Sequence, residues 1–371
     1  MNRTSIRRAF LPGLAVVTLA LSGCAAGNDT GSTSGGGSDS SSSLSGTLNG
    51  GGSSAQESAQ AAWRAGFQSA NGDGVTVNYD PVGSGTGREN FLSKAYAFAG
   101  SDSALSDDEG EVEKAAARCG GKPAVEVPAY VSPIAVLFHV SGVDKLQLSA
   151  PVVADIFTGK ITKWNDPAIA ADNPGAKLPS TTITPVHRSD DSGTTKNFTD
   201  YLAKAGSGKW TADPDGVWPI KGGESGEGTS GLVAAVKAGD GTIGYADESQ
   251  AADLGVAAIK VGSAYTSPSA AGAAKVLAQS PRTPGRDAVD MSIDVDRTTT
   301  AAGAYPLMLT SYLIACQTYD NKTDASLVKG FLSYVVSAQG QQVAAKQAGS
   351  APLDSKLQQE AASIVAKISS K

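Results

Sequence analysis

The sequence predicts an α/β protein with largely parallel sheets. From about residue 44 to the C-terminus, stretches with the alternation or continuous apolar character of strands alternate with stretches of helical periodicity, which is typical of this class. Two long apolar runs, 134–140 and 307–316, have the character of strands buried on both faces. Three glycine-rich turns each join a predicted strand to a helix. A chain of 371 residues can form one large or two medium domains.

The first 46 residues precede the predicted domains. Residues 1–24 have a basic start, an apolar run and Leu-Ser-Gly-Cys at their end, which resembles a lipoprotein export signal with cleavage before Cys24 and lipid on the Cys24 thiol. A plain secretory signal with a chance cysteine is the alternative. Arg7-Arg8 is compatible with twin-arginine export as well as with the general secretory route. Residues 25–46, rich in Gly, Ser, Thr and Asp, predict a flexible tether.

The composition excludes several classes of function. The net charge is −6, and no basic face for nucleic acid is indicated. Only His139 and His187 are present, and no Cys or His spacing matches a zinc site, so no metal is expected. After lipidation of Cys24, Cys119 and Cys316 remain. In an exported protein they most simply form one disulfide, and free thiols are the alternative.

The first half of the folded chain predicts short strands and helices in turn. A strand near 44–48 leads through a glycine turn into a helix over 55–70. The elements that follow are a strand at 75–79, a glycine turn at 82–87, a helix at 88–96, a strand at 98–102 and a helix that reaches Arg118. Ser106 and Glu109 are expected to form a capping box for that last helix. Asp102 precedes the box and has no capping role there.

The second half continues the alternation. The apolar run over 125–140 ends near His139, which is expected to be a surface residue at the end of a strand. The sequence then predicts strands at 161–164, 182–186, 242–245 and 307–316, helices at 148–158, 196–205, 229–238 and 326–346, and an irregular region at 263–300.

The motif from His187 to Thr195 gathers an arginine, two carboxylates and four hydroxyls around one glycine at a strand-to-helix turn. The first N–H groups of a helix form an anion site there. Gly193 lets the backbone approach a ligand, Ser192 and Thr194 add hydroxyls, and Arg188 adds a charged planar donor. The alternative is an ordinary helix start, because Ser, Thr and Asp are preferred N-caps. Repetition of glycine turns in the chain favours the anion site.

Five stretches together carry a family resemblance. They are LNGGGSS at 48–54, VGSGTG at 82–87, AGSDSALSD at 99–107, IFTGKITKWND at 156–166 and RSDDSGTT at 188–195. In these stretches the chain resembles the phosphate-binding lipoproteins, the substrate-binding components of high-affinity phosphate ABC importers. The resemblance runs from about Leu48 to the C-terminus.

The resemblance implies a two-lobed periplasmic-binding-protein fold of type II, with two crossover strands and a ligand cleft between the lobes. The runs 134–140 and 307–316 are the natural crossings. Lobe 1 would then comprise 47–138 and 311–371, including a Cys119–Cys316 bridge, and lobe 2 would comprise 139–310. The implied partners are inorganic phosphate, the permease subunits of the importer, and the outer face of the cell membrane through the lipid on Cys24. A monomer is expected.

The resemblance also implies which residues bind phosphate. Transferred residue by residue, the ligands are Ser54, the backbone N–H of Ala55, Ser84, Asp102, Arg188, Ser192, Gly193 and Thr194. Asp190 matches the carboxylate that orients the arginine. The family often has an aromatic residue where this sequence has Ala55, and Ser53 is the alternative to Ser54 as the first hydroxyl ligand.

Asp102 predicts the choice of anion. A carboxylate can only accept hydrogen bonds, so it suits phosphate, which carries a proton near neutral pH, and not sulfate, which carries none. The implied function is extracytoplasmic phosphate binding and delivery to the importer, with no catalysis and no cofactor. The alternatives are sulfate or molybdate binding by the same fold, a phosphate-ester hydrolase with Ser192 as nucleophile and His187 or Asp190 as base, and a lipoprotein for adhesion or sensing.

Overall fold

The computed structural model describes residues 44–371. The predicted export signal, Cys24 and nearly all of the predicted tether therefore lie outside the described residues. Within residues 44–371, no helix is both long enough and apolar enough to cross a membrane.

The first lobe is built around three parallel strands, β1 (Gly46–Gly52), β2 (Val75–Asp80) and β3 (Phe98–Ser101). Its first helices are α1 (Glu57–Asn71), α2 (Ser84–Leu92) and α3 (Glu111–Arg118). Buried and exposed residues alternate strictly along β2, as the period of two requires for a strand with one buried face. In α1, Trp63 and Phe67 lie one turn apart on the buried face.

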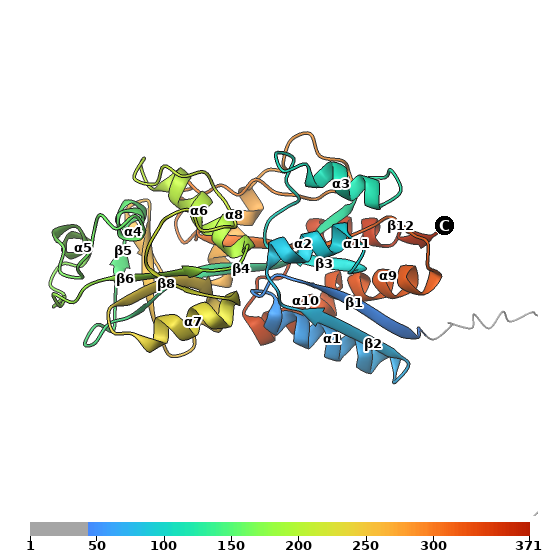
Figure 1. Cartoon of the computed structure of the whole chain (residues 1–371), viewed down its shortest axis with the longest axis horizontal. Coiled ribbons are helices and arrows are strands. Elements are labelled where there is room, and N and C mark those ends of the chain that lie inside the picture. Colours follow the sequence, from blue (N-terminus) through green and yellow to red (C-terminus); the bar gives the residue numbers. More distant parts are fainter. Residues whose placement is uncertain (1–43) are drawn as a thin grey trace, which may run out of the picture. The chain divides into compact units, whose positions relative to one another are not determined.

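Strand β4 (Val125–His139) joins the two lobes (Figure 1). Residues 125–133 pair with β11 (Met308–Ala315), and residues 134–139 pair with β8 (Thr242–Asp247). Every residue of β4 except the terminal His139 is buried, so the expectations for the apolar run and for His139 are confirmed. The main sheet has eleven strands, with β4 and β11 at the centre of the order β2-β1-β3-β11-β4-β8-β6-β7.

The second lobe is built around β8. Its strands are β5 (Gln147–Leu148), β6 (Thr184–Arg188), β7 (Glu224–Gly226), β8, β9 (Gly255–Val261) and β10 (Ala264–Thr266). Its helices are α4 (Ala150–Phe157), α5 (Pro167–Asp172), α6 (Gly193–Ala205), α7 (Gly228–Ala238) and the 3-10 turn η1 (Glu248–Gln250). Figure 1 shows α4 to α7 grouped around β6 and β8, at one end of β4. Helix α8 (Ala270–Gln279) packs on β4 and β11.

The C-terminal segment returns to the first lobe. It contains β12 (Thr318–Tyr319), α9 (Lys322–Val336), α10 (Ala338–Ala348), α11 (Ser355–Val365) and β13 (Ser369–Ser370). The ring of Phe331 packs edge-on against Phe67, with centroids 5.5 Å apart, and Trp63 Nε1 donates to Gly340 O at 2.8 Å. Cys119 and Cys316 form a disulfide with their Cα atoms 5.3 Å apart, so the free-thiol alternative is excluded.

The prediction of a largely parallel sheet is wrong at the centre of the sheet. Strand β11 is antiparallel to both β3 and β4, and β4 is antiparallel to β8 and β9. The reason is the path of the chain, because β4 leaves the first lobe and β11 returns to it. Two strands that cross in opposite directions side by side must pair antiparallel.

Four element predictions need correction. The helix predicted over 88–96 is α2, which runs from Ser84 to Leu92, so residues 84–87 of the predicted glycine turn form its first turn. No strand forms over 161–164, where Lys163 and Thr182 make only an isolated bridge. The helix predicted over 326–346 is two helices separated at Ser337, because the Ser337 hydroxyl accepts from Gly340 N at 3.1 Å and starts α10. The Ser106 hydroxyl accepts from Glu109 N at 3.2 Å, but this turn precedes α3, which begins at Glu111. Helices α5, α8 and α11 were not predicted, and the region 263–300, which was expected to be irregular, contains β10 and α8.

Candidate anion-binding site

The motif from His187 to Thr195 forms the predicted strand-to-helix turn. Strand β6 ends at Arg188, and α6 begins at Gly193 with Ser192 as its N-cap. The Ser192 hydroxyl accepts from Thr195 N at 3.2 Å, so the capping interpretation is correct for this side chain. The hydroxyl keeps its proton for another acceptor, and the N–H groups of Gly193 and Thr194 have no hydrogen-bond partner within residues 44–371. A helix cap and an anion-binding turn are therefore compatible here.

Arg188 is held rigidly by Asp190. The Arg188 side chain is buried, and its Nε donates to Asp190 Oδ1 at 2.7 Å while its Nη2 contacts Asp190 Oδ2. Asp190 Oδ1 also accepts from the N–H of Gly228, the first residue of α7, at 3.0 Å. Burial raises the pKa of Asp190, but the hydrogen bond and the charge of Arg188 outweigh it, and the pKa lies below its usual value. The guanidinium is thus fixed, and its Nη1, which is not bonded to Asp190, lies 3.5 Å from Thr229 Oγ1.

Asp102 accepts hydrogen bonds from three hydroxyls. Its Oδ1 accepts from Ser53 at 2.5 Å and from Ser311 at 2.6 Å, and its Oδ2 accepts from Thr194 at 2.9 Å. The residue is 3% exposed and follows β3. Thr194 belongs to α6 in the second lobe, so the carboxylate of the first lobe is bonded directly across to the second.

Ser53 and Ser54 have different partners. The Ser53 hydroxyl donates to Asp102 and accepts from Ala55 N at 3.1 Å, so the N–H expected to donate to the anion has a partner within the turn. The Ser54 hydroxyl lies 2.9 Å from Thr229 Oγ1 and accepts from Thr229 N at 3.1 Å. Both serines are buried. The Ser53 hydroxyl is therefore bonded to Asp102, whereas the Ser54 hydroxyl is bonded to Thr229 of the second lobe.

The glycine turns allow the two lobes to approach closely. A Cβ atom on Gly193 would lie 2.6 Å from Ser84 Oγ and 2.8 Å from Asp102 Cβ. The N–H of Gly85 donates to Asp191 O at 3.1 Å, and the N–H of Asp102 donates to Ser84 Oγ at 3.1 Å. Ser84 thus lies against Gly193 with its own proton still available.

Gly193→Ala is expected to weaken anion binding by about 1–3 kcal/mol, the usual cost of an overpacked contact. Alanine suits the helical backbone at the start of α6, so the melting temperature should change little. Calorimetric titration with phosphate measures the effect. Gly231→Ala is the matched control, because Gly231 lies in the first turn of α7 and an added Cβ there meets its nearest atom at an ordinary 3.4 Å. Unchanged affinity in the Gly193 variant would contradict the close approach of the lobes.

The structure brings the sequence-predicted residues Ser54, Ala55, Ser84, Asp102, Arg188, Asp190, Ser192, Gly193 and Thr194 into one set of turns linked by the contacts above. Three partners of these residues were not predicted from the sequence: Ser311, Thr229 and Asn197. The Asn197 amide donates to Asp102 O at 2.6 Å. Ser311 lies inside an apolar strand and gave no signal. Thr229 follows a glycine at the start of a predicted helix, the same signal that identified the other turns.

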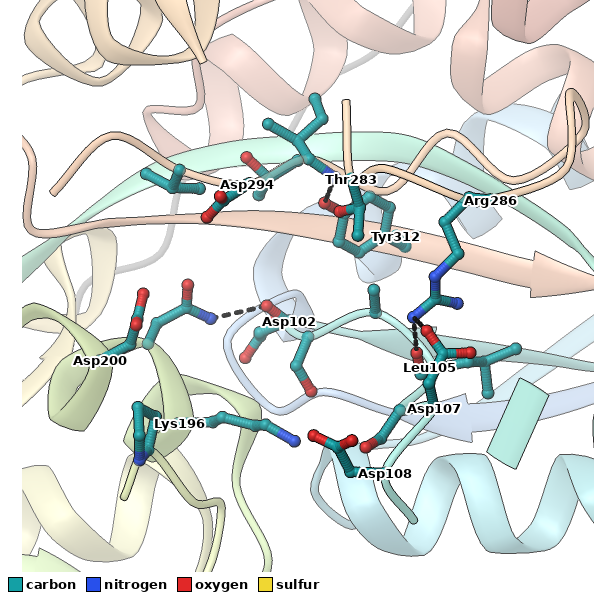
Figure 2. A pocket seen from close by; sticks show the side chains of 18 of the residues that line it. Asp102, Leu105, Asp107, Asp108, Lys196, Asp200, Thr283, Arg286, Asp294 and Tyr312 are labelled. Atoms are coloured by element: carbon teal, nitrogen blue, oxygen red, sulfur yellow. Dashed lines mark hydrogen bonds and ion pairs between the residues drawn. The ribbon is translucent and has the colours of Figure 1, made fainter. Parts of the chain in front are cut away.

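A cavity of about 380 Å³ lies beside Asp102, between α6 and the segment 283–297 (Figure 2). Carboxylates outnumber cations in its lining, and the basic groups are paired with acidic ones. Figure 2 shows Arg286 reaching toward Asp107, with its Nη2 3.1 Å from Asp107 Oδ2. Arg297 Nε lies 2.9 Å from Asp200 Oδ2. These charges do not favour a free anion, so the donors of the turns described above form the better candidate site.

No cluster of metal-ligating side chains occurs within residues 44–371. His187 is stacked on Trp218 with ring centroids 5.1 Å apart, and its Nδ1 lies 2.8 Å from Arg188 O. Within residues 44–371 the His187 ring makes no hydrogen bond to the Ser192 hydroxyl.

Known structures share the fold. A high-affinity periplasmic phosphate-binding protein (PfluDING) bound with phosphate superposes with a TM-score of 0.67 at 24% identity, covering 85% of this chain and 92% of that one. The phosphate-binding protein from Stenotrophomonas maltophilia superposes with a TM-score of 0.65 at 22% identity, covering 86% and 94%. At these identities the similarity concerns the fold, and it agrees with the expected two-lobed class.

Sequence relatives identify the family. Residues 37–339 match the PBP superfamily domain. Phosphate-binding protein PstS 2 of Mycobacterium tuberculosis is 35% identical over 370 residues, covering 96% of this chain and 97% of the relative. Phosphate-binding protein PstS 3 of Mycobacterium leprae is 34% identical over 331 residues, covering 87% and 89%. The chain therefore belongs to the PBP superfamily and, within it, to the PstS phosphate-binding proteins.

Proposed function

We propose that this protein binds inorganic phosphate outside the cytoplasm and delivers it to the permease subunits of a phosphate ABC importer. The observation that carries the proposal is the pairing of an acceptor, Asp102, with the donors of Arg188 and the start of α6. Phosphate needs both, because its oxygens accept hydrogen bonds while its O–H donates one. Membership of the PstS family supports the same function.

The proposed ligands come from both lobes. Ser54 and Ser84 would donate from the first lobe, and Arg188, Ser192 and the N–H groups of Gly193 and Thr194 would donate from the second. The Thr194 hydroxyl donates to Asp102, so in this arrangement Thr194 would contact phosphate through its N–H. The Ala55 N–H would be shared with Ser53. Because the donors are divided between the lobes, phosphate would stabilise the closed state and leave when the lobes open.

Asp102 would make the site selective for a protonated anion. Each carboxylate oxygen has about two positions for hydrogen bonds. Oδ1 is filled by Ser53 and Ser311, whereas Thr194 is the only group among residues 44–371 that donates to Oδ2. The remaining position on Oδ2 would accept the phosphate O–H. Sulfate would place an oxygen against this carboxylate with no proton between them.

The same geometry argues against the hydrolase alternative. A serine nucleophile needs a base within hydrogen-bonding reach. The His187 ring packs on Trp218, and the carboxylate of Asp190 is bound to Arg188. The proposed activity is therefore binding and release with no bond chemistry and no cofactor.

We also propose the lobe boundaries that the family resemblance implies, with one change. Residues 47–138 and 311–371 would form lobe 1 and residues 139–310 lobe 2, except that the segment 282–293 belongs with lobe 1. In support, Glu126 N donates to Val289 O at 3.1 Å, and Arg286 Nη2 donates to Leu105 O at 2.6 Å. Attachment to the outer face of the cell membrane through lipidated Cys24, and a monomeric state, complete the proposal.

The function is tested by calorimetric titration of the mature full-length protein with phosphate and with sulfate. We expect phosphate to bind and sulfate to bind about 10⁴-fold or more weakly, because a site built for a polar hydrogen rejects an analogue that lacks it. Equal affinity for the two anions, or no heat with phosphate, would refute the proposal.

A further inference from the structure

We propose that Thr229 is a positioning residue of the site, whose hydroxyl and N–H turn the proton of Ser54 toward the bound anion. This inference rests on the proposed function. Thr229 is the second residue of α7 in the second lobe and is 1% exposed. Nothing in the family resemblance singled it out, yet it contacts two of the proposed ligands, Ser54 and Arg188.

The groups that can only donate limit the directions that the hydrogen bonds around Ser54 and Thr229 can take. Arg188 Nη1 lies 3.5 Å from Thr229 Oγ1, and a guanidinium has no acceptor. This weak contact occupies a lone pair of the threonine hydroxyl and leaves its proton free to donate. The nearest hydroxyl for that proton is Ser54 Oγ, at 2.9 Å. In the proposed arrangement Thr229 donates this proton to Ser54.

Ser54 then accepts two hydrogen bonds from the same residue. The second comes from Thr229 N at 3.1 Å, and an N–H can only donate. A serine hydroxyl has two lone pairs and one proton, so both lone pairs are filled. The Ser54 proton must point elsewhere, and within residues 44–371 no third group is recorded as bonded to Ser54 Oγ. Ser54 is thereby fixed as a donor, which is what an anion requires.

The opposite assignment is chemically distinct. If Ser54 donates to Thr229, the threonine accepts from both Ser54 and Arg188, and the free proton is on Thr229 itself. Thr229 would then donate to the anion directly and independently of the Ser54 proton. The two assignments differ in how the effects of substitutions at Ser54 and Thr229 combine.

The test is a set of phosphate titrations on the mature full-length protein carrying Thr229→Val, Ser54→Ala or both. Valine keeps the shape and the N–H of Thr229 but removes the hydroxyl. We expect Thr229→Val to weaken binding about three- to tenfold, the usual effect of one neutral hydrogen bond. Thr229→Ser should restore it. The double variant should bind no more weakly than Ser54→Ala, because Thr229 acts through Ser54.

The control is Thr323→Val, since Thr323 is likewise the second residue of a helix, α9, and is exposed and remote from the site. Thr229→Ala, which adds no bulk, replaces valine if thermal melting shows that the valine variant is unfolded. Three results would overturn the inference. They are an unchanged phosphate affinity in Thr229→Val, a loss of affinity in the double variant equal to the product of the two single losses, and a Thr229→Ser variant that binds as weakly as Thr229→Val. If the wild-type protein does not bind phosphate, both the proposed function and this inference are wrong. If the wild-type protein binds phosphate, the results for the Thr229 variants test this inference separately from the proposed function.

Discussion

Replacement of Asp102 by asparagine is expected to abolish most of the discrimination between phosphate and sulfate. The asparagine side chain has one acceptor oxygen and an NH₂ group that donates, so sulfate could be hydrogen-bonded where the carboxylate repels it. We expect the ratio of the two dissociation constants to fall from about 10⁴ or more toward unity, mainly through a gain in sulfate affinity. Competitive calorimetric titration with both anions measures this ratio.

The control for this substitution is Asp172→Asn. Asp172 is also a buried, hydrogen-bonded aspartate, but its partners are Ser149 and Tyr265 in the second lobe. This variant should retain the selectivity of the wild type. If the Asp102→Asn variant is folded by its melting temperature and still keeps the full selectivity for phosphate over sulfate, Asp102 does not accept a hydrogen bond from the phosphate O–H.

Arg188→Ala is expected to reduce phosphate affinity by about 30-fold or more. Removing one partner of a buried charge pair costs about 2–5 kcal/mol, and here the loss also leaves Asp190 without its cation next to a dianion. Arg188→Lys should bind with intermediate affinity, because lysine keeps the charge but cannot reproduce the planar contact with Asp190. Titration with phosphate at fixed ionic strength gives the three dissociation constants.

Two further variants separate binding from folding. Arg188→Ala combined with Asp190→Asn removes the unpaired charge, so this double variant should be more stable than Arg188→Ala and still bind weakly. Arg64→Ala, on the first-lobe helix α1, should leave affinity unchanged. Wild-type affinity in the double variant would show that Arg188 is a structural partner of Asp190 and no ligand.

Much of the local structure could be predicted because it depends on neighbouring residues. The alternation Val75, Val77 and Tyr79 defines β2, and the continuous apolar run defines β4. The turn from Arg188 to Gly193 was recognisable because its cap, its glycine and its cation lie within six residues. Where prediction failed, as at Ser337, a short polar side chain took over a helix start inside a pattern that otherwise continued.

The sequence by itself determined the chemistry of each turn: the donors around Gly193, the fixed charge of Arg188 and the carboxylate of Asp102. The tertiary structure decided which of these groups meet. Asp102 takes its hydrogen bonds from residues 49, 92 and 209 positions away in the chain, and Ser54 meets Thr229 at a separation of 175. Such contacts depend on how β4 and β11 carry the chain between the lobes, and no local period encodes that path. The contact between Ser54 and Thr229 is therefore a property of the folded protein alone.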